Sequence, residues 1–134
     1  MNLEKSYIEE KVVKSSFFFD TYALFEILKG NERYKRYVGS KITVTKLNLF
    51  ELYSGILREV DEKNAQNELD NYYKFAVDFD KETIEEAAKM KLALNKRNVS
   101  MADCIGYILS KRLGIKFLTG DKEFENLKNV EFVK

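Results

Sequence analysis

The sequence predicts an α/β fold in which helices cover both faces of a central, mostly parallel sheet. Three observations lead to this prediction. Short runs of β-branched and aromatic residues alternate with longer amphipathic segments along the 134 residues. Strands that are separated by helices are joined by crossover connections, which favour a parallel sheet. The chain has no proline and only 6 glycines, so no Pro/Gly-rich linker divides it. We therefore expect a single domain over residues 1–134, with residues 1–14 as an N-terminal extension.

Five segments have the composition of strands, so the sheet should contain four or five of them. The first is apolar and aromatic and stops at Asp20, and the others are shorter runs of the same kind. The predicted strands cover residues 12–19, 42–45, 76–79, 115–118 and 130–133.

The intervening segments have helical patterns. In residues 47–60, Leu49, Leu52 and Ile56 fall on one apolar stripe at helical spacing. Gly30 and Gly114 follow two of the other segments, as is typical where helices end. The predicted helices cover residues 22–29, 31–38, 47–60, 61–75, 80–97 and 100–113, with a short one that follows the turn at 119–121 and runs through 127.

The composition excludes several kinds of chemistry. The chain contains no histidine and a single cysteine, Cys104, so it has no Ser-His-Asp triad, no histidine-bound metal and no cysteine-built zinc site. The formal net charge is +1, which gives no bulk electrostatic sign of nucleic-acid binding. Any catalysis must use carboxylates, lysines, hydroxyls or a metal ion that these groups hold.

Two acidic residues follow predicted strands at the end of the sheet where such folds bind ligands. Asp20 follows the first strand directly, and Asp121 follows the strand over 115–118 after a short turn. Each also fits a simpler role as the cap of the next helix. Asp103 fits a capping box with Ser100, and Glu51 points away from the apolar stripe of its helix. Taken one at a time, these acids are not specific signals.

The motifs as a set are more specific. Four motifs make up the set: Phe-Phe-Asp-Thr at 18–21, the segment from Thr45 through Phe-Glu-Leu-Tyr-Ser-Gly at 50–55, Ala-Asp-Cys-Ile at 102–105 and Leu-Thr-Gly-Asp-Lys-Glu-Phe at 118–124. In order and spacing they resemble the PIN-domain nucleases, and among these the small VapC-type toxins of bacterial and archaeal toxin–antitoxin pairs. The resemblance covers roughly residues 17–133. It implies a three-layer α/β/α PIN-like fold with strand order 3-2-1-4-5. Residues 1–14 extend beyond the usual start of this family, and Cys104 replaces its commoner small or aliphatic residue.

The resemblance also implies the site and its cofactor. The residues that match the family's acidic quartet, as catalytic residues and metal ligands, are Asp20, Glu51, Asp103 and Asp121. Thr119 matches the Ser/Thr that supports the first aspartate, and Glu123 is a further acid in a supporting position. Without a cation, such a cluster would repel a phosphate, whereas Mg²⁺ or Mn²⁺ takes oxygen ligands and activates water. Lys46, Arg58 and Lys122 are candidate phosphate contacts.

The leading hypothesis is therefore a Mg²⁺- or Mn²⁺-dependent endoribonuclease, the toxin of a type II toxin–antitoxin pair. The resemblance implies an RNA substrate, a homodimer and a VapB-like antitoxin. A second hypothesis is a non-catalytic binding protein on the same scaffold. A third is a Mg²⁺-dependent phosphatase, although the second aspartate that haloacid-dehalogenase enzymes place two residues after the first is missing here. No segment has the pattern of a signal peptide or membrane span, so we expect a cytoplasmic protein.

Overall fold

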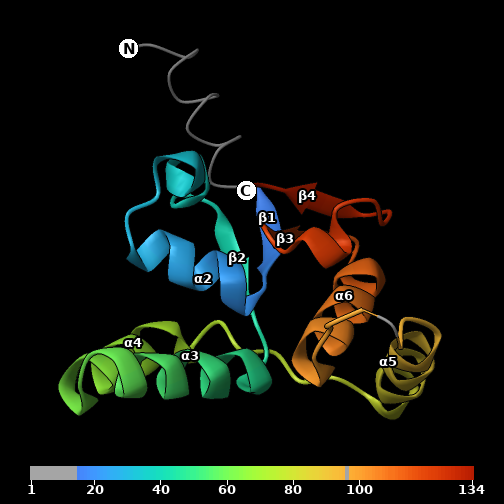
Figure 1. The fold of residues 1–134 in the computed structure, drawn as a ribbon, viewed down its shortest axis with the longest axis horizontal. Helices are drawn as coiled ribbons and strands as arrows, with labels where there is room; N and C mark the ends of the chain where they lie inside the picture. The colour runs from blue at the N-terminus through green and yellow to red at the C-terminus, as the bar shows by residue number, and fades with distance from the viewer. Residues whose placement is uncertain (1–14, 96) are drawn as a thin grey trace, which may run out of the picture.

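The computed structural model describes residues 15–95 and 97–134, so the N-terminal extension predicted over 1–14 lies outside the described residues. Its centre is a parallel sheet whose strands stand in the order β2-β1-β3-β4 (Figure 1). The strands are β1 (Ser16–Phe19), β2 (Lys41–Thr43), β3 (Lys116–Thr119) and β4 (Val130–Phe132). The predicted α/β class with a parallel sheet is confirmed.

Helices lie on both sides of this sheet. In Figure 1, α2, α3 and α4 lie to the left of β1 and β3, whereas α5 and α6 lie to the right. The α-helices are α2 (Thr21–Leu28), α3 (Lys46–Glu59), α4 (Glu62–Tyr73), α5 (Lys81–Ala93) and α6 (Met101–Leu113), and the 3₁₀ helices are η1 (Glu32–Tyr37) and η2 (Lys122–Phe124). None of the described helices is long and apolar enough to cross a membrane.

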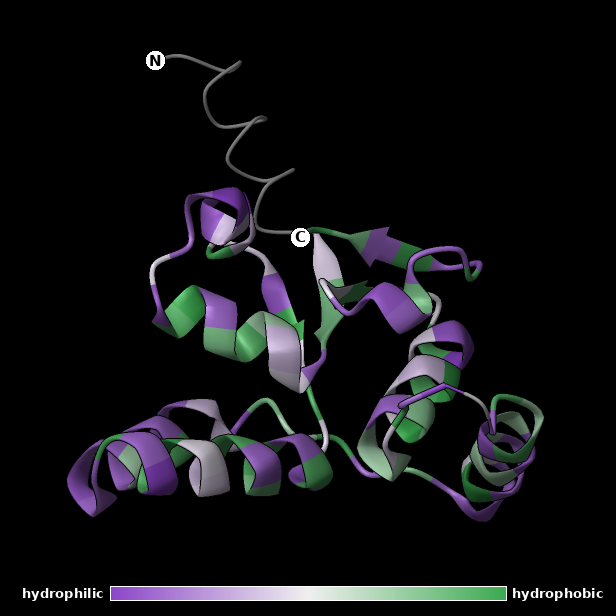
Figure 2. Cartoon of the chain, viewed as in Figure 1, coloured by the Kyte–Doolittle hydropathy of each residue, from purple (hydrophilic) through white to green (hydrophobic). Residues whose placement is uncertain are grey.

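Alternation along the two central strands divides the apolar interior into two layers. Phe19 and Leu118 pack with α2, α3 and α4 on one face of the sheet. Phe18 and Phe117 pack with α5 and α6 on the other face, with their rings stacked at 5.8 Å between centroids. All four side chains are fully buried, so β1 and β3 are covered on both faces, as expected of a parallel sheet. By contrast, α4 carries mostly hydrophilic residues, and Ala65 is its one buried residue (Figure 2).

The strand predicted over 76–79 is wrong. This segment meets the residue after β2 through a single bridge between Val44 and Ala76, so the sheet has four strands and lacks the outermost one of the predicted order. Val77 and Asp78 are exposed, and Ala76 and Phe79 pack against different apolar layers, so the segment does not bury one continuous strand face against the sheet. Asp80 then begins α5 as its cap. The helix predicted over 31–38 is the short 3₁₀ helix η1.

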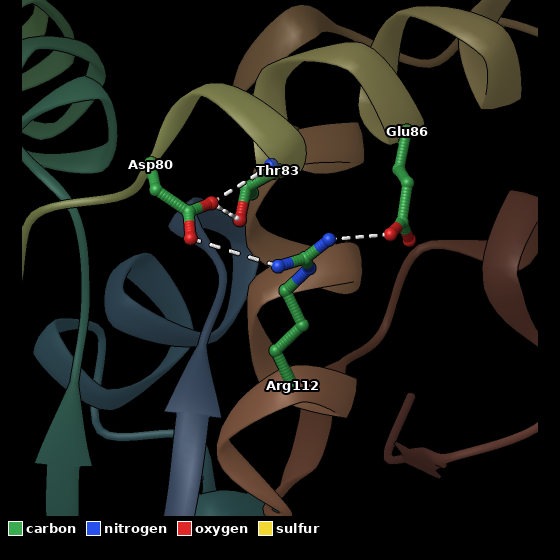
Figure 3. Close-up of polar contacts among 4 residues, drawn as sticks. All are labelled: Asp80, Thr83, Glu86 and Arg112. Atoms are coloured by element: carbon green, nitrogen blue, oxygen red, sulfur yellow. Dashed lines mark hydrogen bonds and ion pairs between the residues drawn. The ribbon is translucent and has the colours of Figure 1, made fainter.

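Helices α5 and α6 are joined at their surface by Arg112. Figure 3 shows its guanidinium between the carboxylates of Asp80 and Glu86, with Nη1 at 3.6 Å and Nη2 at 2.5 Å from their oxygens. Asp80 also accepts hydrogen bonds from the Thr83 backbone and hydroxyl, which fixes the start of α5. Because these ion pairs are largely exposed, the apolar layer beneath them contributes more to holding the two helices together.

Gly106 lets α6 approach the sheet closely. A Cβ at this position would lie 2.5 Å from Phe18 Cε1 and 3.2 Å from Phe117 Cε1. We therefore expect Gly106→Ala to lower the free energy of unfolding by ~1–3 kcal/mol, as overpacking does, despite the better helix propensity of alanine. Urea denaturation measures the change. Replacing the Phe18 ring with the smaller leucine side chain should relieve the clash, so Phe18→Leu should recover part of the lost stability in the double variant. Unchanged stability of Gly106→Ala would contradict the packing described.

Candidate active site

Two neighbouring strands bring Asp20 and Thr119 together. Phe19 of β1 is in register with Leu118 of β3, so the residues that follow them lie side by side at the carboxyl ends of the strands. Asp20 is 1% exposed. Its Oδ1 accepts a hydrogen bond from Ala23 N at 2.8 Å, which caps α2, and its Oδ2 accepts one from the Thr119 hydroxyl at 2.5 Å.

The Thr119 hydroxyl also connects Asp20 to Asp121. It accepts a hydrogen bond from the backbone N–H of Asp121 at 3.0 Å while it donates to Asp20. Asp121 in turn caps η2, because its Oδ1 accepts from Glu123 N at 3.0 Å. One buried hydroxyl therefore orients the first aspartate and the turn that carries the last one.

Glu51 reaches the same end of the sheet from α3. Its Oε1 accepts a hydrogen bond of 2.5 Å from the hydroxyl of Thr21, the residue that directly follows Asp20. Asn48 donates to that hydroxyl at 3.3 Å, and its own Oδ1 accepts from the backbone and hydroxyl of Thr45. The sequence analysis did not identify Thr21 or Asn48 as partners of Glu51. The one available signal was the Asn three residues after Thr45, which is the spacing of a capping box.

Asp103 occupies the first turn of α6. Its Oδ2 accepts from Ser100 N at 3.0 Å, and its own N–H donates to the Ser100 hydroxyl at 3.1 Å, which completes the capping box expected from the sequence. The side chain is half-buried. Asp20 and Asp121 are thus the N-caps of α2 and η2, and Asp103 completes the capping box of α6.

Two of the four carboxylates have a raised pKa. Burial is the main cause that raises the pKa of Asp20 to about 8; the charges of Asp103 and Asp121 act in the same direction, and the hydrogen bonds from Thr119 and Ala23 oppose the shift. Burial also raises the pKa of Asp103, and the charges of Glu51 and Asp121 add to this effect. Among the ion pairs between described residues, none joins a lysine or arginine to any of the four. The site therefore concentrates negative charge with no protein cation paired to it in this part of the chain.

The donor set suits a hard divalent cation that keeps part of its water shell. All the acidic side chains offer oxygen, and Glu51, Asp103 and Asp121 each have one carboxylate oxygen that accepts no hydrogen bond from the described residues. Within residues 15–95 and 97–134, no three acidic, histidine or cysteine side chains form a ready ligand group. Mg²⁺ is commonly held by one or two carboxylates and several waters, so the arrangement fits such an ion without a closed protein cage.

The predicted supporting and phosphate-binding residues lie at different places. Glu123 is half-buried beside Asp121, and Lys122 lies exposed between them. Lys46 begins α3, with its Nζ 5.9 Å from the ring centroid of Tyr73 on α4. Arg58 is exposed further along α3. Of these three cations, Lys122 alone is adjacent in the chain to one of the four acids.

Comparisons with known proteins agree with this architecture. The sequence model of the family described as PIN domain matches residues 17–130. The structure is similar to a toxin–antitoxin complex from Klebsiella pneumoniae, with TM-score 0.65 and 15% identity over 85% of this chain and 94% of that chain. VapBC2 from Rickettsia felis, bound to a promoter DNA fragment, gives TM-score 0.65 and 15% identity over 88% and 97% of the two chains. VapBC-1 from nontypeable Haemophilus influenzae gives TM-score 0.65 and 14% identity over 89% and 97%. Comparison with curated protein sequences gave no match.

Proposed function

This chain belongs to the PIN domain family, and we propose that it is a metal-dependent endoribonuclease that hydrolyses RNA phosphodiester bonds. The observation that supports this most directly is the convergence of acids from four segments at one end of the sheet. Thr119 connects Asp20 and Asp121 through its hydroxyl, and the electrostatic effects on Asp103 come from Glu51 and Asp121. Buried carboxylates such as Asp20 and Asp103, whose pKa is raised by burial and by the charges of neighbouring acids, are typical of sites where charge is arranged for catalysis.

In the proposed site, Asp20, Glu51, Asp103 and Asp121 would hold Mg²⁺ or Mn²⁺. A divalent ion so bound supplies an activated water and neutralises charge on the phosphate. Thr119 and Thr21 keep the Asp20 and Glu51 carboxylates in place by donating hydrogen bonds to them. Asp103 Oδ1 accepts no hydrogen bond from the described residues and would orient the attacking water, and Lys122, the residue after Asp121, would contact the substrate phosphate.

We further propose that the chain is the toxin of a type II toxin–antitoxin pair, with a VapB-like antitoxin as partner. The similarity to three structures whose names describe toxin–antitoxin or VapBC complexes supports this proposal. A homodimer and a cytoplasmic location follow as expectations from the same relationship.

The enzymatic proposal is tested by incubating the purified chain with labelled RNA. We expect cleavage in Mg²⁺ or Mn²⁺, none in EDTA, and little or none of a DNA of the same sequence. Cleavage that persists in EDTA would contradict metal dependence, and equal cleavage of DNA would contradict the substrate class. Hydrolysis of a generic phosphomonoester without action on RNA would favour the phosphatase hypothesis instead.

A non-catalytic binding protein is the second candidate. The specific observation in its favour is that Asp20 and Asp121 each cap a helix and Asp103 completes a capping box, roles that need no metal. Calorimetric titration with Mn²⁺ separates the two candidates, because the nuclease should release or absorb heat on binding the ion and a purely structural set of caps should not.

A further inference from the structure

A surface pocket between α2 and α3, called here the α2–α3 pocket, is lined by residues that lie one helical turn from Glu51 and next to Thr21. Its volume is about 540 Å³, which is in the range of small-ligand sites. Tyr22 and Phe25 of α2 supply its aromatic wall, and Gly55 of α3 faces them. Gly55 has no room for a side chain, since a Cβ there would lie 2.4 Å from Phe25 Cζ.

Two positions along the chain and one contact relate the α2–α3 pocket to the carboxylates. Gly55 lies one helical turn after Glu51, and Tyr22 directly follows Thr21, the residue that donates to Glu51. The Tyr22 ring also lies against the turn before Asp121, because a Cβ at Gly120 would be 2.3 Å from Tyr22 Cε1. A polymer chain whose phosphate sits among the acids would therefore have a neighbouring unit within reach of the pocket.

The outer rim of the pocket carries cations that are only loosely held. Lys29 pairs with Glu26 at 3.5 Å and Arg58 pairs with Glu59 at 3.0 Å, and both cationic side chains are 71% exposed. Exposed ion pairs of this kind contribute little energy, so either cation can turn toward a phosphate at small cost. The combination of an aromatic wall and movable cations suits a planar base with a phosphate attached.

We propose that the α2–α3 pocket is a nucleoside subsite for single-stranded RNA, in which a base next to the scissile phosphate stacks on Tyr22 while Arg58 contacts a flanking phosphate. The proposal rests on the proposed ribonuclease function. It adds a binding site outside the acidic quartet and gives Arg58 a role in holding substrate rather than in the chemical step.

The test measures RNA binding and RNA cleavage separately. Fluorescence anisotropy with a labelled single-stranded RNA is done in Mg²⁺ on the Asp20→Asn chain, which keeps the probe intact. Adding Tyr22→Leu should weaken binding about 10-fold, the size of one lost stacking contact, and adding Arg58→Gln should weaken it by a similar factor because a phosphate contact is lost. Tyr22→Phe keeps the ring and should keep the affinity. Arg33→Gln is the matched control, because Arg33 is an exposed cation on η1, and it should leave binding unchanged.

Equal affinity in all these variants would overturn the subsite. The subsite would also be overturned if Tyr22→Leu and Arg58→Gln bound RNA normally but lost binding of a protein partner, because the pocket would then bind that partner. If the predicted affinity pattern holds while the wild-type chain fails to cleave RNA in Mg²⁺ or Mn²⁺, the subsite stands and the proposed catalysis fails. If the wild type cleaves RNA and the pocket variants bind RNA normally, the proposed catalysis stands and the subsite fails.

Discussion

Asp20→Asn is expected to reduce Mg²⁺-dependent RNA cleavage by about 100-fold or more. Loss of a residue that only hydrogen-bonds to a metal ligand already lowers metal affinity or activity about 10–100-fold, so loss of a carboxylate ligand itself should lower activity at least as much. Asparagine keeps the size of the side chain and an oxygen that can accept from Ala23 N, so α2 retains its cap. The effect should therefore fall on activity and not on the fold, and initial rates with a labelled RNA measure it.

The matched control is Asp70→Asn. Asp70 is an exposed aspartate on α4 that accepts a hydrogen bond from Gln66 and has no contact with the four acids. Its replacement should leave the cleavage rate unchanged. Full activity of Asp20→Asn would remove Asp20 from the catalytic site and with it the proposed roles of its neighbours.

The second large effect is a pH dependence of stability that comes from Asp20. Its folded-state pKa of about 8 lies above the ordinary value of 3.8, so the folded chain holds this proton more tightly than the unfolded chain does. Deprotonation between these two values therefore favours unfolding, and the stability contribution of Asp20 falls as the pH rises across this window. The shift corresponds to an effect on the order of several kcal/mol.

Urea denaturation of the wild type and of Asp20→Asn in EDTA, from about pH 5 to about pH 8, isolates this contribution. The asparagine variant should become progressively more stable than the wild type as the pH increases. Because Asp103 is present in both chains, its own raised pKa contributes to both curves and largely cancels in the difference. A difference that does not vary with pH would show that Asp20 has the same proton affinity in the folded and unfolded states.

The sequence predicts the central part of the fold well because its signals there are local. The run of three phenylalanines before Asp20 favours a strand buried on both faces, and the structure places Phe18 and Phe19 in opposite apolar layers. The segment over 76–79 is also partly apolar, but it contains Asp78 and lies at the sheet edge. There the outcome depends on what covers the segment, and its exposed residues leave it with one bridge.

The candidate site was predictable as a list of acids and not as a network. Asp20, Asp103 and Asp121 lie in motifs that are visible in the sequence, and the same motifs predict their capping hydrogen bonds. The hydrogen bonds of Thr21 with Glu51 and Asn48 join residues 30 and 27 positions apart. They exist because α2 packs on α3, and no local pattern specifies that contact.

The aspartates that begin helices have a consequence for how this protein can change over time. Asparagine caps a helix as well as aspartate does, and a single base substitution converts one codon into the other. Under the proposed function, one substitution at Asp20 would therefore abolish catalysis, while the polypeptide stays folded and keeps its outer surfaces unchanged.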